Sequence, residues 1–326
     1  MNKPVPSAST ASEPAVSFQE VSEHQAGQRL DNFLLARLKG VPKSRIYRII
    51  RKGEVRVNKK REKPDYKLQT GDLVRIPPVR VAAPNEQQPP GEALLALLED
   101  AILYADDAII IINKPAGLPV HGGTGVKVGL IEALRYRHPE AAGLELAHRL
   151  DKGTSGCLLL ARQGKTLKNL GAQFRENTVH KTYHALVAGA WPEAITEVGA
   201  ALKRQEAQGG ERFVSVDTEG KKALTRFRIL EMFAEASLVQ ARPVTGRTHQ
   251  IRVHAQLAGH PIIGDEKYAE DDSNRHFAKL GIRRLCLHAR ELSLTHPETG
   301  KTLTVRAPYD SQFEQALAQL RMPAGD

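Results

Sequence analysis

An acidic residue set among cations is the strongest chemical feature of this 326-residue sequence. Residues 148–156 read His-Arg-Leu-Asp-Lys-Gly-Thr-Ser-Gly and lead into the apolar run 157–160. Neighbouring positive charge favours a carboxylate, so Asp151 is expected to be ionised. Loops that a sheet holds in place commonly carry function, so this charged loop is a candidate functional site. The alternative is a surface loop whose charges are incidental.

A second segment, residues 246–254, reads Gly-Arg-Thr-His-Gln-Ile-Arg-Val-His. Gly246 permits a tight turn, and Thr248 is expected to cap a helix over residues 249–258. Arg247 would then lie at a helix N-terminus, where backbone donors and the helix dipole help to hold an anion. The alternative is an exposed loop cation.

Other candidate sites are weaker. The glycine-rich residues 121–125 lack the Gly-Lys-Ser/Thr ending of a phosphate loop, which favours a flexible turn. His249 and His254 are five residues apart, with no acid between them as in a zinc protease, so no metal site is expected. Cys157 and Cys286 lie in apolar runs, which predicts buried reduced thiols and a cytoplasmic protein.

Positive charge is concentrated near the N-terminus. Residues 27–80 hold sixteen Lys and Arg and five Asp and Glu, so this segment carries 16 − 5 = +11. The net charge is +10, which leaves 10 − 11 = −1 for the rest of the chain. A basic block on a nearly neutral body indicates a module that binds a polyanion.

The basic block has the pattern of a small folded unit. Apolar spacing predicts helices over residues 30–38 and 43–52, and alternation predicts strands over residues 54–58 and 73–76. Cations remain on the outer face of the second helix and after the first strand. The predicted RNA-binding residues are Lys43, Arg45, Arg48, Arg51, Lys52, Lys59, Lys60 and Arg61.

Composition divides the chain into four parts. Residues 1–18 are predicted to be a disordered tail, and residues 19–80 the basic module. Residues 81–93 belong to a Pro-rich stretch that is expected to be a linker. Residues 94–326 form the larger domain. No run approaches the roughly 20 apolar residues that cross a bilayer, so no membrane association is expected.

The larger domain has a mixed pattern. Hairpins alternate with helices, which favours an α+β fold with a largely antiparallel sheet over a doubly wound parallel one. A helix is expected over residues 164–176. The expected strands are residues 109–112, 158–161, 183–187, 225–233, 237–242, 291–295 and 302–306.

These segments together resemble a known family. Residues 148–156 and 246–254 are similar to the two hallmark motifs of the RluA-type pseudouridine synthases. Further matching motifs are Asn-Lys-Pro-Ala-Gly at 113–117, Lys-Thr-Tyr at 181–183 and Arg-Leu-Cys-Leu-His-Ala at 284–289. The basic block resembles an S4 RNA-binding domain, as its Gly-Glu-Val-Arg-Val-Asn at residues 53–58 illustrates.

The resemblance implies a role for five residues. Asp151 matches the catalytic aspartate, Arg247 the arginine that pairs with it, and Tyr183 a tyrosine that packs on the target base. Because an ammonium cannot reproduce the planar contact of a guanidinium, Arg247→Lys is predicted to impair catalysis. Arg149 matches the arginine that fills the gap left by the flipped uridine, and Leu287 a leucine beneath the active site.

The implied activity is isomerisation of uridine to pseudouridine in 23S ribosomal RNA, with no cofactor. The expected partner is that RNA or a large-subunit assembly intermediate, and the protein is expected to be a monomer. Three alternatives remain open from the sequence: a catalytically silent RNA-binding factor, a metal-dependent nuclease, and the same reaction at other uridines of large-subunit or transfer RNA.

Overall fold

The structure is a computed structural model that describes residues 16–38, 41–79, 89–122, 128–139, 143–206 and 212–322. Two compact units divide the chain, Met1–Gln88 and Pro89–Asp326. Most of the predicted tail and residues 81–88 of the predicted linker lie outside the described residues. Within the described residues, no helix is long and apolar enough to cross a membrane.

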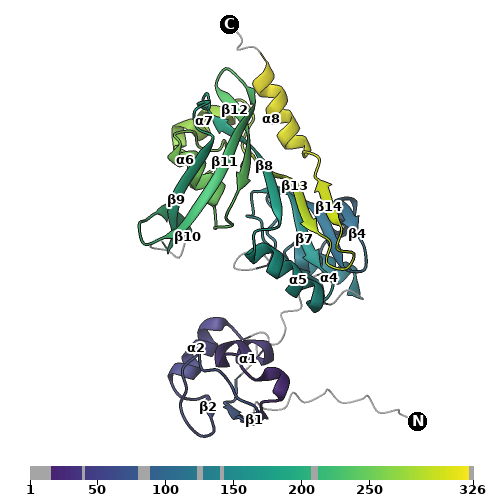
Figure 1. Cartoon of the computed structure of the whole chain (residues 1–326), viewed down its shortest axis with the longest axis vertical. Coiled ribbons are helices and arrows are strands. Elements are labelled where there is room, and N and C mark those ends of the chain that lie inside the picture. The colour runs from purple at the N-terminus through teal and green to yellow at the C-terminus, as the bar shows by residue number, and fades with distance from the viewer. Residues whose placement is uncertain are drawn as a thin grey trace, which may run out of the picture. The chain divides into compact units, whose positions relative to one another are not determined.

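The smaller unit is a three-stranded sheet with two helices (Figure 1). Its strands follow the order β1-β3-β2, and Phe33, Ile46 and Val74 are among its fully buried core residues. Its elements are β1 (Ser17–Glu20), a short 3-10 helix η1 (Glu23–Gln25), α1 (Leu30–Arg37), α2 (Lys43–Arg51), β2 (Arg56–Val57) and β3 (Leu73–Ile76).

Two expectations for this unit need correction. The tail was expected to run to residue 18, but Ser17 and Phe18 pair with β3 as the start of β1. The strand expected over residues 54–58 is shorter, because Asn58 and Lys59 take positive φ angles of 49° and 67° in a turn. The side chain of Lys43 lies outside the described set, and the other seven predicted RNA-binding residues are exposed.

The larger unit is built on an 11-stranded sheet of order β10-β9-β11-β12-β8-β13-β7-β5-β4, with β14 beside β13 and β6 beside β7. Among the described strand pairs, β13 and β7 are parallel and the others antiparallel, which confirms the α+β fold class. The elements are α3 (Glu92–Asp100), β4 (Ile102–Ala105), β5 (Ile109–Lys114), α4 (Leu130–Arg137), β6 (Glu145–Leu146), β7 (Ser155–Ala161), α5 (Gly164–Arg175), β8 (His180–Ala188), β9 (Glu197–Glu206), β10 (Arg212–Val216), β11 (Lys221–Met232), β12 (Ala236–Pro243), α6 (Gln250–Leu257), α7 (Asp271–Lys279), β13 (Leu287–Thr295), β14 (Thr302–Arg306) and α8 (Ser311–Arg321).

Every strand expected in this unit is present, and so is the helix over residues 164–176. The linker was expected to run to residue 93, but Glu92 and Ala93 already belong to α3. This helix buries Leu95 and Leu98 against the sheet, so the apolar spacing outweighs the nearby prolines.

Strand β5 shows how the sheet separates two cores. Ile110 and Ile112 pack in a cluster with residues of α3 and α4, whereas Ile109 and Ile111 pack in a cluster with residues of α5 and β13. Successive side chains of a strand point to opposite faces, so an unbroken run of isoleucines is what a strand covered on both faces requires.

Buried histidines give the fold a dependence on pH. His254 and His288 are fully buried, and burial lowers the pKa of each to about 4. An unfolded chain binds protons at these residues below about pH 6.5, whereas the folded chain does not until about pH 4. Folding stability is therefore fully present above pH 6.5 and falls as the pH drops from there toward 4.

We expect the free energy of unfolding to decrease between pH 7 and pH 5, by up to about 1.4 kcal/mol per pH unit for each such histidine. Urea titrations at several pH values measure this. A His288→Gln variant cannot take up the proton and should show a shallower slope. A free energy that does not change over this range would contradict the prediction.

Candidate active site

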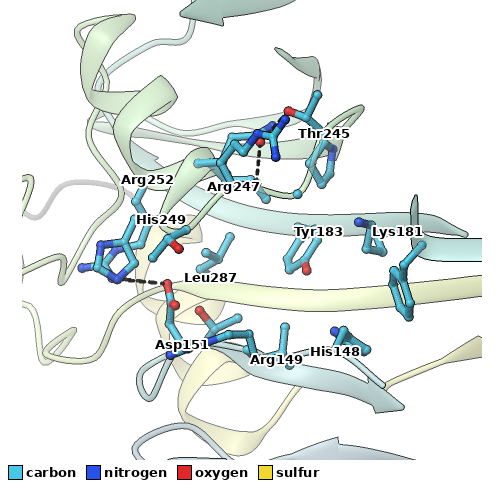
Figure 2. A pocket seen from close by; sticks show the side chains of 18 of the residues that line it. His148, Arg149, Asp151, Lys181, Tyr183, Thr245, Arg247, His249, Arg252 and Leu287 are labelled. Carbon is cyan, nitrogen blue, oxygen red and sulfur yellow. Dashed lines mark hydrogen bonds and ion pairs between the residues drawn. The ribbon is translucent and has the colours of Figure 1, made fainter. Parts of the chain in front are cut away.

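A cleft of about 590 Å³ opens on the larger unit. Its walls come from the turn before β7, the end of α5, strand β8, the loop between β12 and α6, and the start of β13 (Figure 2). All five residues with a role implied by the resemblance line this one cleft: Arg149, Asp151, Tyr183, Arg247 and Leu287. Residues as far apart in sequence as Arg149 and Leu287, 287 − 149 = 138 positions, thus meet at one place.

Asp151 is held by a tight turn. The backbone N–H of Thr154 donates to the carbonyl oxygen of Asp151 over 3.1 Å. Lys114, which is fully buried, donates from Nζ to the Lys152 carbonyl oxygen at 3.1 Å and to two carbonyls of its own loop at 2.7 Å. Burial lowers the pKa of Lys114 to about 7, and the charge of Arg284 adds to this. The turn therefore rests on a buried lysine that fixes its backbone.

The arginine beside Asp151 is Arg252, which corrects the expectation for Arg247. Nη1 of Arg252 lies 3.4 Å from Oδ2 of Asp151. Arg247 instead donates from Nε to the carbonyl oxygen of Lys222 over 3.4 Å, and its side chain is exposed. Figure 2 shows Asp151 facing Arg252, with Arg247 across the cleft.

The start of α6 explains why Arg252 and not Arg247 reaches Asp151. The helix begins at Gln250, and its N-cap is His249, in a left-handed conformation with φ of 53°. Thr248 therefore does not cap the helix as expected. The Gln250 side chain instead holds the loop before the helix, because its Oε1 accepts from Arg247 N at 3.0 Å and from Thr245 Oγ1 at 2.7 Å. Arg252 is then in the first helical turn, directed inward.

Asp265 holds Arg252 in place. The guanidinium donates from Nε and Nη2 to the two carboxylate oxygens of Asp265, both over 2.7 Å, and Asp265 is almost completely buried. Burial works to lower the pKa of Arg252, but the hydrogen bonds and charge of Asp265 outweigh it and raise that pKa. Arg252 is thus a fixed cation shared by two carboxylates.

A close backbone approach positions Asp265. Gly264 has φ of 75°, and a Cβ there would lie 1.9 Å from the carbonyl oxygen of Arg284. Glycine is therefore needed just before Asp265.

His249 completes the cluster around Asp151, with Nε2 at 3.7 Å from Asp151 Oδ2 and Nδ1 at 2.7 Å from the hydroxyl of Tyr268. Burial lowers the pKa of His249, and the charge of Asp151 opposes this.

Tyr183 and Leu287 come from neighbouring strands. Tyr183 of β8 is opposite Ala289 of β13 in the sheet register, and Leu287 is buried two residues before Ala289. Burial raises the pKa of Tyr183 above its usual range, and the charge of Asp151 raises it further. The Tyr183 ring is directed into the cleft (Figure 2).

The cleft is strongly cationic. Among the described residues that line it, Asp151 is the one carboxylate, and the cations are Arg149, Arg175, Lys181, Arg247 and Arg252. Arg149 is exposed where it lines the cleft. Within the described residues, no group of three or more His, Cys, Asp or Glu is placed to hold a metal ion.

Comparison with known proteins identifies the family. The family profile described as RNA pseudouridylate synthase matches residues 108–257. The chain is 54% identical over 309 residues to Ribosomal large subunit pseudouridine synthase C of Haemophilus influenzae, covering 94% of this chain and 96% of that protein. This chain belongs to the RNA pseudouridylate synthase family. The Escherichia coli K12 protein of the same name is 52% identical over 311 residues, covering 94% and 98% of the two chains.

Solved pseudouridylate synthases have a related structure. Human RNA Pseudouridylate Synthase Domain Containing 4 has a TM-score of 0.58 and 27% identity, and the match covers 72% of this chain and 98% of that one. The S4 domain profile matches residues 28–74, within the smaller unit. The protein is therefore an RNA pseudouridine synthase with an S4 domain.

Three residues near Asp151 had no role assigned to them from the sequence: Arg252 and His249, which line the cleft, and Asp265, which holds Arg252. Arg252 had a recognisable signal, since it interrupts the apolar run Ile-Arg-Val of a helix, where an unpaired cation would be costly. Asp265 follows Pro-Ile-Ile-Gly in a similar way. The partners of both residues lie far away in sequence, so spacing alone could not pair them.

Proposed function

We propose that this pseudouridine synthase modifies uridines of 23S ribosomal RNA. The support for this substrate is the 52–54% identity, over 94% of the chain, to proteins named for the large ribosomal subunit. The observation that carries the chemistry is the Asp151 carboxylate, 3.4 Å from a fixed arginine in a cationic cleft beside Tyr183.

Asp151 is the proposed nucleophile. Its carboxylate attacks C1′ of the ribose, and the bond from C1′ to uracil N1 breaks, with the electron pair leaving on the base. The uracil anion spreads its charge over two carbonyls, so a single carboxylate suffices where most glycosidases need two. After the base turns, C5 bonds to C1′ and the Asp151–C1′ bond breaks, which regenerates the carboxylate. The proton on C5 then passes to a base, and N1, which has lost its bond to C1′, takes up a proton.

Arg252 orients this carboxylate. Tyr183 presents its ring to the flipped base, with Leu287 beneath. Tyr183 is also proposed as the proton acceptor late in the reaction, when C5 loses its proton. Arg149 fills the gap in the RNA, which offsets part of the few kcal/mol that base extrusion costs.

The protein acts as a cytoplasmic monomer, without a metal or cofactor, on 23S ribosomal RNA or on an assembly intermediate that contains it. The S4 domain binds the RNA backbone, and the synthase cleft binds the target uridine.

Tritium release tests the chemistry. RNA labelled at uridine C5 loses its label only when C5 forms the new carbon–carbon bond. Large-subunit RNA from a strain that lacks this gene should release tritium with the wild-type enzyme, and mature RNA should not. Release from transfer RNA but not from large-subunit RNA would replace the proposed substrate.

The S4 domain should supply a salt-dependent part of RNA affinity. Arg45, Arg48 and Arg51 line one hollow of this domain. Replacing all three with Gln should weaken RNA binding and lower the slope of log K against log salt by roughly 2 to 3, one phosphate contact per arginine. Filter binding at several salt concentrations measures this. An unchanged slope would show that this face does not contact RNA. The control is the same change to Gln at three exposed cations of the larger unit, Lys279, Arg283 and Lys301, which should leave the slope unchanged.

A further inference from the structure

Lys181 is a cation of the cleft that the proposed chemistry does not use. It lies two residues before Tyr183 on β8, so the two side chains share one face of the strand, roughly 7 Å apart. Figure 2 shows Tyr183 between Lys181 and the Asp151 end of the cleft. Lys181 is therefore placed beside the flipped base and away from the reacting bond.

The environment of Lys181 lacks an anion. Its Nζ is 5.5 Å from the centre of the Phe174 ring and would be 3.7 Å from a Cβ added to Gly246. Across the described part of the chain, Lys181 makes neither an ion pair nor a side-chain hydrogen bond, and Asp151 is the one carboxylate that lines the cleft. The positive charge of Lys181 also contributes to lowering the pKa of His148, to about 3, after the effect of burial.

This arrangement has an energetic cost in the free protein. Burial lowers the pKa of Lys181, which means that its charged form is poorly solvated where it lies. A partly buried cation without a counter-ion is unfavourable unless a ligand supplies the opposite charge. The ring of Phe174 offers a weaker cation–π contact, which orients the ammonium without neutralising it.

We propose that Lys181, held over Phe174, binds a backbone phosphate of the RNA next to the flipped uridine. The site fixes how far the uridine enters the cleft, since the phosphate and the base are then held at two points on one strand. Arg175 and Asn177 line the same end of the cleft and extend this surface. This inference rests on the proposed function in one respect: the target uridine must enter the cleft and reach Asp151.

The test pairs a protein variant with a change in the RNA. Lys181→Met keeps the aliphatic stem over Phe174 and removes the charge. The probe is a synthetic large-subunit RNA stem-loop that contains a target uridine mapped with the wild-type enzyme. Neutral methylphosphonate linkages replace single phosphates one at a time around this uridine. Binding is measured in an Asp151→Ala background, so that no turnover changes the RNA.

We expect Lys181→Met to weaken binding about ten-fold. It should also lower the salt slope by about 0.7, the value for one single-strand phosphate. One methylphosphonate position should weaken binding to the Lys181 protein and have no further effect on the Met variant. In the active enzyme, KM should rise about ten-fold with kcat within about two-fold. Lys279→Met, an equal charge change on the exposed face of α7, should leave all of these unchanged.

The proposal is wrong if the Lys181→Met variant and each methylphosphonate weaken binding independently at every linkage, so that the two affinity losses multiply. It is also wrong if Lys181→Met binds the RNA as tightly as the protein with Lys181. If the Met variant is poorly folded by circular dichroism, Lys181→Gln carries the same expectations. The proposed function fails separately, because it requires tritium release from large-subunit RNA by the wild-type enzyme, whatever Lys181 binds.

Discussion

Asp151→Asn is expected to reduce pseudouridine formation by on the order of 10⁴-fold or more. The substitution is nearly isosteric, so the turn from Asp151 to Thr154 keeps its 3.1 Å backbone hydrogen bond. It removes the proposed nucleophile and the negative charge that faces Arg252. Tritium release measures the loss of activity. RNA affinity should not fall, because Asp151 is negatively charged and does not attract the RNA phosphates.

The matched control for this prediction is Asp107→Asn, the same chemical change at an exposed residue before β5. It should have wild-type activity. If Asp151→Asn also releases tritium at close to the wild-type rate, Asp151 is not the nucleophile, and the cleft must use different chemistry.

Arg252→Lys is expected to have the second largest effect. A lysine has one ammonium and cannot donate two parallel hydrogen bonds to Asp265 while it faces Asp151. Separating a buried charge from its partner costs about 3–5 kcal/mol, so the variant should be less stable as well as slow, with kcat lowered roughly 10²- to 10³-fold. Rates should be measured where circular dichroism shows that the variant is folded.

Arg247→Lys provides the comparison. The resemblance assigned the aspartate-pairing role to Arg247, and that assignment predicts the larger loss there. The structure reverses the order, because the Arg247 guanidinium is exposed and contacts one carbonyl oxygen. A larger loss of kcat in Arg247→Lys than in Arg252→Lys would mean that the cleft rearranges when RNA binds.

The amino-acid sequence by itself determined the local elements and the chemistry-bearing segments. An apolar run predicted strand β5, a hairpin pattern predicted strand β11, and helical spacing predicted helix α2, because those patterns depend on near neighbours. The charge excess of residues 27–80 located the RNA-binding unit, and the motif around Asp151 indicated the residue that we propose as the nucleophile. Motif resemblance also indicated the family that the comparisons show.

Only the tertiary structure decided which arginine serves Asp151. Arg247 and Arg252 are five residues apart in one motif, and both line the cleft. Two features set their different positions. His249 is left-handed and the Gln250 side chain holds the loop before the helix, while Asp265, thirteen residues after Arg252 and next to Gly264, binds the Arg252 guanidinium. These contacts depend on where separate segments meet in space. Sequence spacing does not encode such distances, so the pairing had to come from the fold.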